Sequence, residues 1–189
     1  MKYAGMITGG VRLPRRLLAI AVILAGTGFP DPSRAIGTVE RAGDIVQILL
    51  PTTAYGATFY MDDRQGRSEF YRSFLTTFAV THSLKNIINK KRPDGGDQAF
   101  PSGHTGAAFQ GAAFIQQRYG WVYGIPSYLG ASFVGYSRIH ADRHDLADVL
   151  AGAALGIGTN MLFTTNYITY SVTPTVGEDG VGATIRFRW

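Results

Sequence analysis

Long stretches without a charged residue are the feature that most limits how this chain can fold. Residues 45–61, 119–137 and 149–177 contain no Asp, Glu, Lys or Arg. Charged residues make up 16% of the chain, against roughly 25% in an ordinary soluble domain. Thr, Gly, Gln and Asn interrupt these stretches, so none is a clean apolar span of about 20 residues. The pattern excludes a disordered chain and leaves a membrane-facing protein open.

Length and composition narrow the possible functions further. The chain has 189 residues, enough for one domain with its own core and a short appendage. It has no cysteine, which removes disulfide frameworks, thiolate zinc sites, iron–sulfur clusters and cysteine nucleophiles. Of the net charge of +5, residues 1–35 carry +4, from five basic residues and one acidic residue. The remainder is close to neutral, so we expect no nucleic-acid partner.

Residues 1–35 have the layout of a secretory signal peptide. A basic stretch ends at Arg15 and Arg16, the apolar run 17–28 follows, and Ser33-Arg34-Ala35 suits signal cleavage. The apolar run is short for a hydrocarbon core of about 30 Å. We therefore expect a cleaved signal rather than a permanent anchor, with an uncleaved amphipathic arm as the alternative. The positive flank predicts export across a bacterial inner membrane, with the body on the periplasmic side.

Apolar residues at helical spacing predict an all-α fold, a helical bundle of about five to six helices. We expect helices near residues 44–61, with Asp44 as N-cap, and near 68–90, 101–118, 126–136 and 144–163. Alternation around the turn at 177–180 predicts a small C-terminal β-hairpin packed on the helical body. The predicted domains are a signal peptide at 1–35, the helical bundle at 36–166 and the hairpin at 167–189.

Two of three polar clusters point to an anion. Lys85 and Arg92 lie seven residues apart, which places them on one face of a helix, and such a pair of cations suits phosphate. Residues 101–104 (PSGH) open a helix whose free N–H groups form an anion site. There Ser102 adds a hydroxyl donor and His104 an acid or base. A solvated basic helix end and an ordinary N-cap are the plain alternatives.

The third cluster supplies a candidate nucleophile. Ser137 and Arg138 are followed by His144 and, four residues later, by Asp148. On a shared helix face the carboxylate can accept a hydrogen bond from one imidazole nitrogen and leave the other as the nucleophile. The alternative is a surface ion pair, but Asp148 stands among apolar residues, where an idle carboxylate would be costly.

In order, the segments KNIINKKRP, PSGH and SRIHADRHDLAD resemble the signature of the type-2 phosphatidic acid phosphatase superfamily, KxxxxxxRP, PSGH and SRxxxxxHxxxD. Every specified position is matched, and the motifs span residues 85–148. The first 35 residues and the C-terminal hairpin lie outside the resemblance. It implies a helical bundle that hydrolyses phosphoric monoesters without a metal or other cofactor.

The resemblance also implies a role for each matched residue. His144 would attack phosphorus, Asp148 would orient it, and His104 would protonate the leaving oxygen. Water activated by His104 would then hydrolyse the phosphohistidine. The phosphoryl oxygens would be bound by the remaining positions, Lys85, Arg92, Ser102, the backbone N–H of Gly103, and Arg138.

Three other functions compete with this interpretation. His140 and His144 could hold zinc in a metallohydrolase, but position 141 is Ala where an HExxH motif has Glu. Vanadium haloperoxidases resemble the same motifs with vanadate in place of phosphate, yet they are much larger proteins. A noncatalytic envelope protein built around the hairpin would leave the three motifs unexplained.

The substrate is less constrained than the reaction. Relatives of this type act on lipid phosphates or pyrophosphates in membranes, or are soluble periplasmic acid phosphatases of broad specificity. The charge-free stretches favour the membrane-associated lipid phosphatase. We expect a phosphorylated lipid or small-molecule phosphate as substrate, with the active site facing the periplasm.

Overall fold

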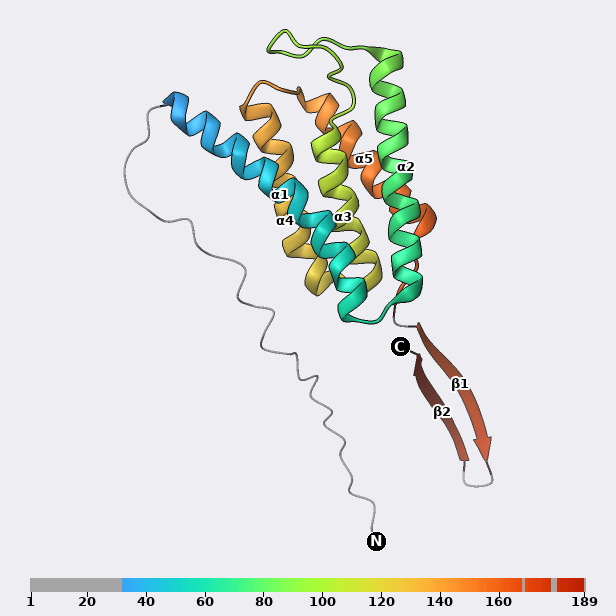
Figure 1. Ribbon diagram of the computed structural model, residues 1–189. Coiled ribbons are helices and arrows are strands. Elements are labelled where there is room, and N and C mark those ends of the chain that lie inside the picture. The colour runs from blue at the N-terminus through green and yellow to red at the C-terminus, as the bar shows by residue number, and fades with distance from the viewer. Residues whose placement is uncertain (1–31, 168, 178–179, 189) are drawn as a thin grey trace. The chain divides into compact units, whose positions relative to one another are not determined.

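The computed structural model describes residues 32–167, 169–177 and 180–188, with side chains described over 37–167. The helices of this part of the chain are α1 (Pro32–Tyr60), α2 (Arg64–Ile88), α3 (Gly103–Tyr119), α4 (Trp121–His140) and α5 (Leu146–Phe163), shown in Figure 1. They confirm the predicted all-α bundle. The predicted signal peptide lies mostly outside the described residues, so its cleavage after Ala35 and the domain limits stay predictions.

The third helix is the centre of the bundle. It packs against each of the other four helices, and Figure 1 shows it between them. A Cβ atom added to Gly152 of α5 would lie 2.4 Å from the carbonyl oxygen of Ser102, and one added to Gly156 would lie 2.5 Å from that of Gly106. Such close backbone contact through small residues is typical of helices packed in membranes. It fixes α5 directly against the first turns of α3.

The interior combines apolar clusters with hydrogen bonds between helices. Thr77 of α2 and Thr159 of α5 join their hydroxyl groups at 2.6 Å. Gln110 of α3 donates its amide to Ser73 at 2.9 Å, and Asn160 of α5 donates to the Gln110 carbonyl at 2.9 Å. These polar contacts tie α2, α3 and α5 together. The buried apolar residues form two clusters, one of Ala54, Phe70, Phe114 and Ile115, the other of Ala108, Ala112, Ala131 and Val134.

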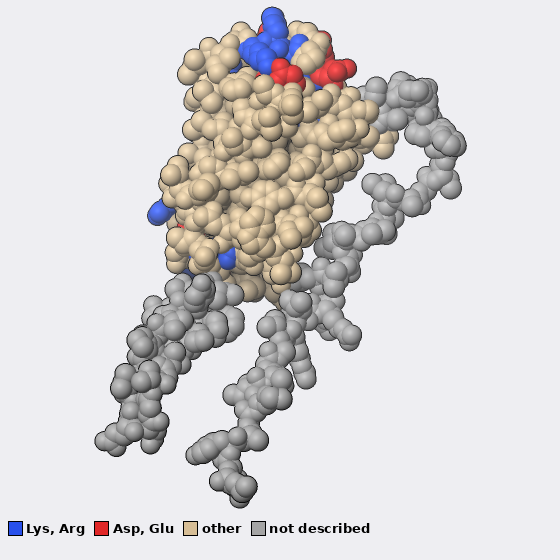
Figure 2. All heavy atoms as spheres, turned by 180° about the vertical axis from the view of Figure 1, so that it is seen from behind, with Lys and Arg blue, Asp and Glu red and all other residues tan. Residues whose placement is uncertain are grey.

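Charged side chains leave the middle of each helix free. The helix segments without a charged residue are 45–60, 73–84, 105–117, 121–137 and 149–163. On the face shown in Figure 2, Lys, Arg, Asp and Glu gather at the upper end, above a broad band with none. Several large apolar side chains of these segments are exposed, among them Leu75, Leu129, Leu150, Met161 and Leu162. Among the described helices, α5 is long and apolar enough to cross a membrane by length and composition.

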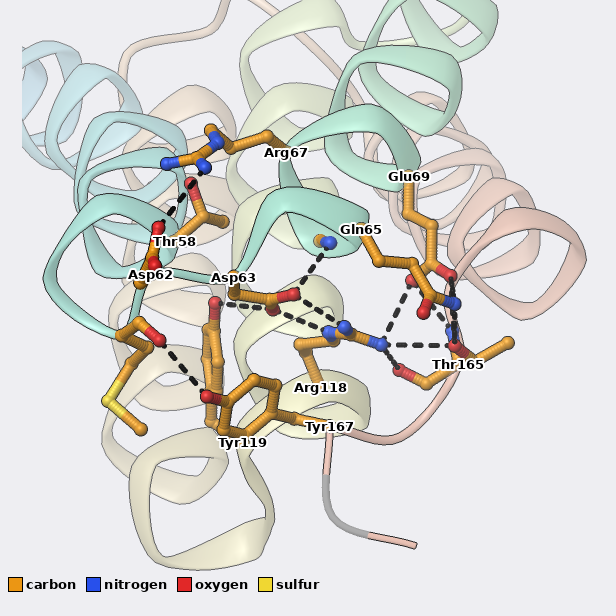
Figure 3. A network of polar contacts seen from close by, with 12 residues as sticks. Thr58, Asp62, Asp63, Gln65, Arg67, Glu69, Arg118, Tyr119, Thr165 and Tyr167 are labelled. Atoms are coloured by element: carbon orange, nitrogen blue, oxygen red, sulfur yellow. Dashed lines mark hydrogen bonds and ion pairs between the residues drawn. The ribbon is translucent and has the colours of Figure 1, made fainter. Parts of the chain in front are cut away.

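A buried ionic network closes the end of the bundle opposite the start of α3 (Figure 3). Arg118, in the last turn of α3, donates to both carboxylate oxygens of Asp63 at 2.6 Å. It also reaches Glu69 at 3.3 Å and the carbonyl oxygen of Thr165 at 2.9 Å. Because Arg118 and Asp63 are both buried, removing one partner would leave an unpaired buried charge, at a cost of about 3–5 kcal/mol. The network holds α2, α3 and the segment after α5 together.

Two helices begin well before the residue that the sequence predicts. The first helix begins at Pro32 rather than at residue 44, so Asp44 lies inside it and is not an N-cap. The fourth begins at Trp121 and continues through Pro126, where the sequence predicts a break. Ser127, next to that proline, donates its hydroxyl to the Tyr123 carbonyl at 2.8 Å, and such side-chain bonds help a helix tolerate proline.

The segment after the bundle contains two strands. Residues of β1 (Thr169–Gly177) pair antiparallel with those of β2 (Gly180–Arg188), with Thr169 opposite Arg188. Only the backbone of these strands is described. The fold class rests on the helices alone, and a hairpin packed on the helical body is not confirmed.

Candidate active site

A cavity of about 520 Å³ lies at the charged end of the bundle. Of the eight predicted site residues, six line it, while Ser102 and Asp148 are fully buried outside its lining. The structure thus brings motif residues from α2, α3, α4 and the loops together. The cavity is lined by Glu40, Asp44, Gln47, Phe74, Thr77, Phe78, Thr81, His82, Lys85, Arg92, Gly103, His104, Ala107, Arg138, Arg143 and His144.

His144 lies in the loop just before α5, and not on the helix as its spacing from Asp148 predicts. The helix begins at Leu146, with Asp145 as its N-cap. Asp145 and Asp148 form a capping box, in which each side chain accepts a hydrogen bond from the other's backbone N–H. The Nδ1 atom of His144 is 3.6 Å from Oδ2 of Asp148, and it has no hydrogen-bond partner among the described residues. The carboxylate is therefore beside the imidazole, slightly beyond hydrogen-bond range.

The surroundings of His144 favour its neutral form. The side chain is 3% exposed. Burial first, and then the positive charges of Lys85 and Arg92, lower the pKa of His144 to about 4, while Asp148 acts in the opposite direction. A neutral imidazole has the free electron pair that a nucleophile needs. The site is thus suited to nucleophilic attack at neutral pH.

Lys85 and Arg92 line the cavity together, but not as neighbours on one helix. The second helix ends at Ile88, and Asn89 follows in the left-handed conformation with φ of 42°. Arg92 therefore lies in the loop, where its Nε donates to the Asp97 carbonyl at 3.1 Å. Lys85, in the last turn of α2, donates to the Gln98 carbonyl at 2.5 Å. The prediction of a shared helix face was wrong, and the loop brings the two cations together instead.

The PSGH segment forms the first turn of α3. Ser102 is the N-cap and accepts a weak hydrogen bond from the Thr105 N–H at 3.4 Å. Its hydroxyl also lies 3.0 Å from that of Thr105, and its backbone N–H donates to the Asp148 carbonyl at 2.9 Å. Gly103 and His104 face the cavity. The free N–H groups of this helix start therefore border the cavity, as an anion site requires.

Two carboxylates of α1 enter the site, which the sequence analysis missed. Arg138, at the end of α4, is 2.9 Å from Oδ1 of Asp44 and donates to the Glu40 carbonyl at 2.7 Å. The Glu40 carboxylate pairs with Arg143 at 2.9 Å. Glu40 and Asp44 are four residues apart and so share a helix face. Two carboxylates on one helix face are unusual beside an apolar stretch, and this spacing was the sequence signal that could have pointed to them.

His104 also has a carboxylate partner. Its Nε2 atom lies 3.3 Å from Oδ1 of Asp44. Burial, followed by the charge of Arg138, lowers the pKa of His104, whereas Asp44 raises it. The net effect is a lowered pKa, so the neutral imidazole, which can accept a proton, is favoured, while Asp44 supports the protonated form that can give one.

The residues of the rival zinc site are placed differently. The ring of His140 stacks on Tyr136 with centroids 5.4 Å apart and does not line the cavity that His144 faces. Among the described residues, no three His, Asp or Glu side chains are grouped so that they could hold a metal ion.

Comparison with known proteins gives the family. The model of the PAP2 superfamily matches residues 69–170. Lipid A 4'-phosphatase of Helicobacter pylori is 30% identical over 141 residues, which cover 68% of this chain and 71% of that protein. Lipid A 1-phosphatase of Porphyromonas gingivalis is 39% identical over 132 residues, which cover 63% of this chain but only 28% of that protein.

The fold has solved relatives as well. The transmembrane PAP2 type phosphatidylglycerolphosphate phosphatase of Bacillus subtilis superposes with a TM-score of 0.56 at 24% identity. The match covers 72% of this chain and 76% of that one. The fold, the three motifs around one cavity and a family match over more than half of the sequence agree, and the chain belongs to the PAP2 superfamily.

Proposed function

We propose that this PAP2 enzyme is a membrane-associated lipid phosphatase that hydrolyses phosphate monoesters through a phosphohistidine on His144. The observation that carries the proposal is the cavity itself. It places a buried, neutral imidazole beside the cations Lys85, Arg92 and Arg138, and continues along an apolar wall.

The proposed first step transfers the phosphoryl group to His144. Its Nδ1 faces Asp148, which leaves Nε2 to attack. The Nε2 electron pair forms a bond to phosphorus while the bond from phosphorus to the lipid oxygen breaks. His104 gives its proton to that leaving oxygen, and Asp148 stabilises the imidazole that now carries the phosphoryl group.

The second step releases phosphate. Water gives a proton to His104, its oxygen bonds to phosphorus, and the P–N bond breaks. Inorganic phosphate leaves, and His144 is neutral again. His104 gives a proton in the first step and takes one back from water in the second, so the cycle closes with no net change in the enzyme.

Fixed positive charge supports both steps. The transferring phosphoryl group spreads negative charge over three oxygens, and preorganised cations stabilise that charge most strongly in a site that excludes water. Lys85, Arg92, Arg138 and the N–H of Gly103 border the cavity. Ser102 is predicted to help as well, and its buried hydroxyl would have to turn from Thr105 to do so.

The apolar wall favours a lipid as substrate. Phe74 and Phe78 of α2 and Ala107 of α3 line the same cavity as the cations. A small hydrophilic phosphate would gain nothing from such a wall, whereas an acyl chain or lipid backbone would bury apolar surface there. The relatives are lipid A phosphatases and a phosphatidylglycerolphosphate phosphatase by name, which supports a phosphorylated glycolipid or glycerophospholipid.

The uncharged middle of the bundle favours a membrane over a soluble enzyme. Its segments carry exposed apolar side chains such as Leu129 and Leu162, which hydrocarbon solvates better than water. A soluble periplasmic phosphatase of broad specificity is therefore not favoured. With the predicted signal peptide, the charged end would face the periplasm.

The test uses the full chain extracted in detergent. We expect release of phosphate from a lipid phosphate such as phosphatidate in the presence of EDTA, with competitive inhibition by vanadate. His144→Ala should abolish turnover and the radiolabelled phosphoenzyme trapped by rapid quench. His140→Ala is the matched control and should retain both, because His140 does not line the cavity.

Other outcomes would contradict specific parts of the proposal. Activity lost in chelator and restored by zinc would favour the metallohydrolase. Label on a peptide that contains His104 but not His144 would overturn the assignment of the nucleophile. Full activity on small phosphates with none on lipid phosphates would favour the soluble type.

A further inference from the structure

We infer that Lys90 is a positioning residue for the nucleophile: it binds Asp148 and balances its charge, which keeps the His144 imidazole neutral. Lys90 is a variable position of the first motif, and the two residues that follow it, Lys91 and Arg92, are also basic. The inference rests on the proposed function, in which neutral His144 attacks phosphorus.

The contacts of Asp148 carry the inference. This side chain is fully buried, and its Oδ1 accepts a hydrogen bond from Nζ of Lys90 at 2.8 Å. Its Oδ2 accepts from the N–H of Asp145 at 3.2 Å and lies 3.6 Å from Nδ1 of His144. Lys90 thus binds the carboxylate most closely, and the Asp145 N–H comes next. The imidazole that the carboxylate is expected to orient lies just beyond hydrogen-bond range.

The position of Lys90 is set by the backbone. It follows Asn89, the left-handed C-cap of α2, and its carbonyl accepts a hydrogen bond from the N–H of Ala99 at 2.8 Å. Its ammonium group also forms an ion pair with Asp145, the N-cap of α5. Lys90 thereby joins the loop of the first motif to the start of α5. It does not line the cavity, so a direct role in phosphate binding is not expected.

The physical consequence concerns protonation. A carboxylate beside an imidazole stabilises the imidazolium and raises its pKa. An ammonium group on the same carboxylate offsets that field, and the hydrogen bond to Oδ1 withdraws negative charge. With Lys90 in place, Asp148 can orient His144 without drawing a proton onto it. Without Lys90, the imidazolium would be the main cationic partner of a buried carboxylate.

A substitution of Lys90 leaves the other charged groups around His144 and Asp148 unchanged. His144 also experiences Lys85 and Arg92, from α2 and the loop after it. Asp148 also faces Asp145 on its own side and Lys85 across the loop. The cavity around them contains Asp44 and Glu40 of α1, His104 of α3, Arg138 of α4 and Arg143.

Lys91 offers a matched control. It precedes Arg92 in the same loop, but its side chain is 74% exposed and pairs with Asp97 at 2.5 Å. Lys91→Gln removes the same charge from the next residue without touching Asp148. Lys90→Arg keeps the charge and a donor for the carboxylate.

The experiment is a titration of His144 in detergent-solubilised full-length protein with isotope-labelled histidine. The chain has four histidines, and the spectrum of His144→Asn assigns the signal. We expect Lys90→Gln to move the midpoint of the His144 titration upward by about one pH unit. Lys91→Gln and Lys90→Arg should stay near the wild-type midpoint. The acid limb of kcat/KM should move in parallel.

The titration separates this inference from the proposed function. The titration measures the protonation of His144 directly, so it tests the role of Lys90 even in a protein that shows no turnover. Missing turnover, by contrast, would contradict the proposed phosphatase function and not the role of Lys90. An unchanged midpoint in Lys90→Gln, or an equal shift in Lys91→Gln, would overturn the role of Lys90. If Lys90→Gln does not fold, a large shift in Lys90→Arg overturns it equally, because that variant retains the charge.

Discussion

The Nε2 atom of His104 lies 3.3 Å from Oδ1 of Asp44, and the same oxygen is 2.9 Å from the guanidinium of Arg138. One carboxylate of α1 thus links the proposed proton donor to a proposed phosphate-binding cation. The contact joins the first helix, which lies outside the three motifs, to the centre of the site.

Asp44→Asn should impair substrates according to their leaving group. The imidazolium of His104 loses its anionic partner, so less of it is protonated when the leaving oxygen needs a proton. We expect kcat to fall by about 10- to 100-fold for a lipid phosphate, which has a poor leaving group, and much less for p-nitrophenyl phosphate. Steady-state kinetics on both substrates measures the ratio.

Asp62→Asn is the control for this prediction, because Asp62 is exposed and pairs with Arg67 at the other end of the bundle. It should leave both rates unchanged. If Asp44→Asn lowered kcat equally for the two substrates, Asp44 would act only through Arg138 and not through His104.

The pH dependence should reflect the depressed pKa of His144, about 4. Above that pH the imidazole is neutral and can attack, and below it protonation removes the nucleophile. For p-nitrophenyl phosphate, which hardly needs His104, kcat/KM should therefore stay level from neutral pH to about pH 5 once the ionisation of the substrate is divided out. An ordinary histidine would instead give a limb near pH 6.5, and a limb at that value would contradict the assignment.

Gly152→Ala should damage the site without touching the substrate. Its Cβ would lie 2.4 Å from the carbonyl oxygen of Ser102, so the first turn of α3 or α5 must move. A displacement of this kind in a preorganised site costs about 10- to 100-fold in kcat/KM. Gly158→Ala, on the same helix with open space around it, should retain activity. Equal activities of the two variants would show that the contact with Ser102 is not needed.

Phe78→Ala should change the preference for chain length. Phe78 lines the cavity and its ring is 4.0 Å from that of His82. Removing the ring takes apolar surface from the wall proposed to contact the lipid, so kcat/KM should fall about tenfold for a long-chain lipid phosphate. A short-chain analogue should lose little. Leu75→Ala, an exposed residue of α2 outside the cavity lining, controls for a general effect on the helix surface.

Local sequence predicted much of the fold and most of the residues that meet at the candidate site. The helical periodicity gave a bundle, and six of the eight predicted residues line one cavity. Motif spacing succeeds here because each motif straddles a helix end: Ser102 caps α3, and Asp145 and Asp148 cap α5. Capping depends on residues within one turn, so sequence carries it.

The sequence predicted the residues at which helices begin and end less well. Asp44 before an apolar stretch has the appearance of an N-cap, yet it lies inside α1 and serves the site. Arg92 has helical spacing from Lys85, yet the left-handed Asn89 ends the helix between them. In both cases a short pattern is compatible with two structures, and packing against other helices selects one.

The chain alone determined which residue types are available to act on a phosphate, because the motifs contain the histidines, cations and carboxylate in order. Only the tertiary structure decided how these groups are paired. Asp44 meets His104 and Lys90 meets Asp148 across different elements, and such contacts depend on the packing of α1 and α5 against α3. Charge interactions act through space over a few ångströms, whereas sequence records only the distance along the chain.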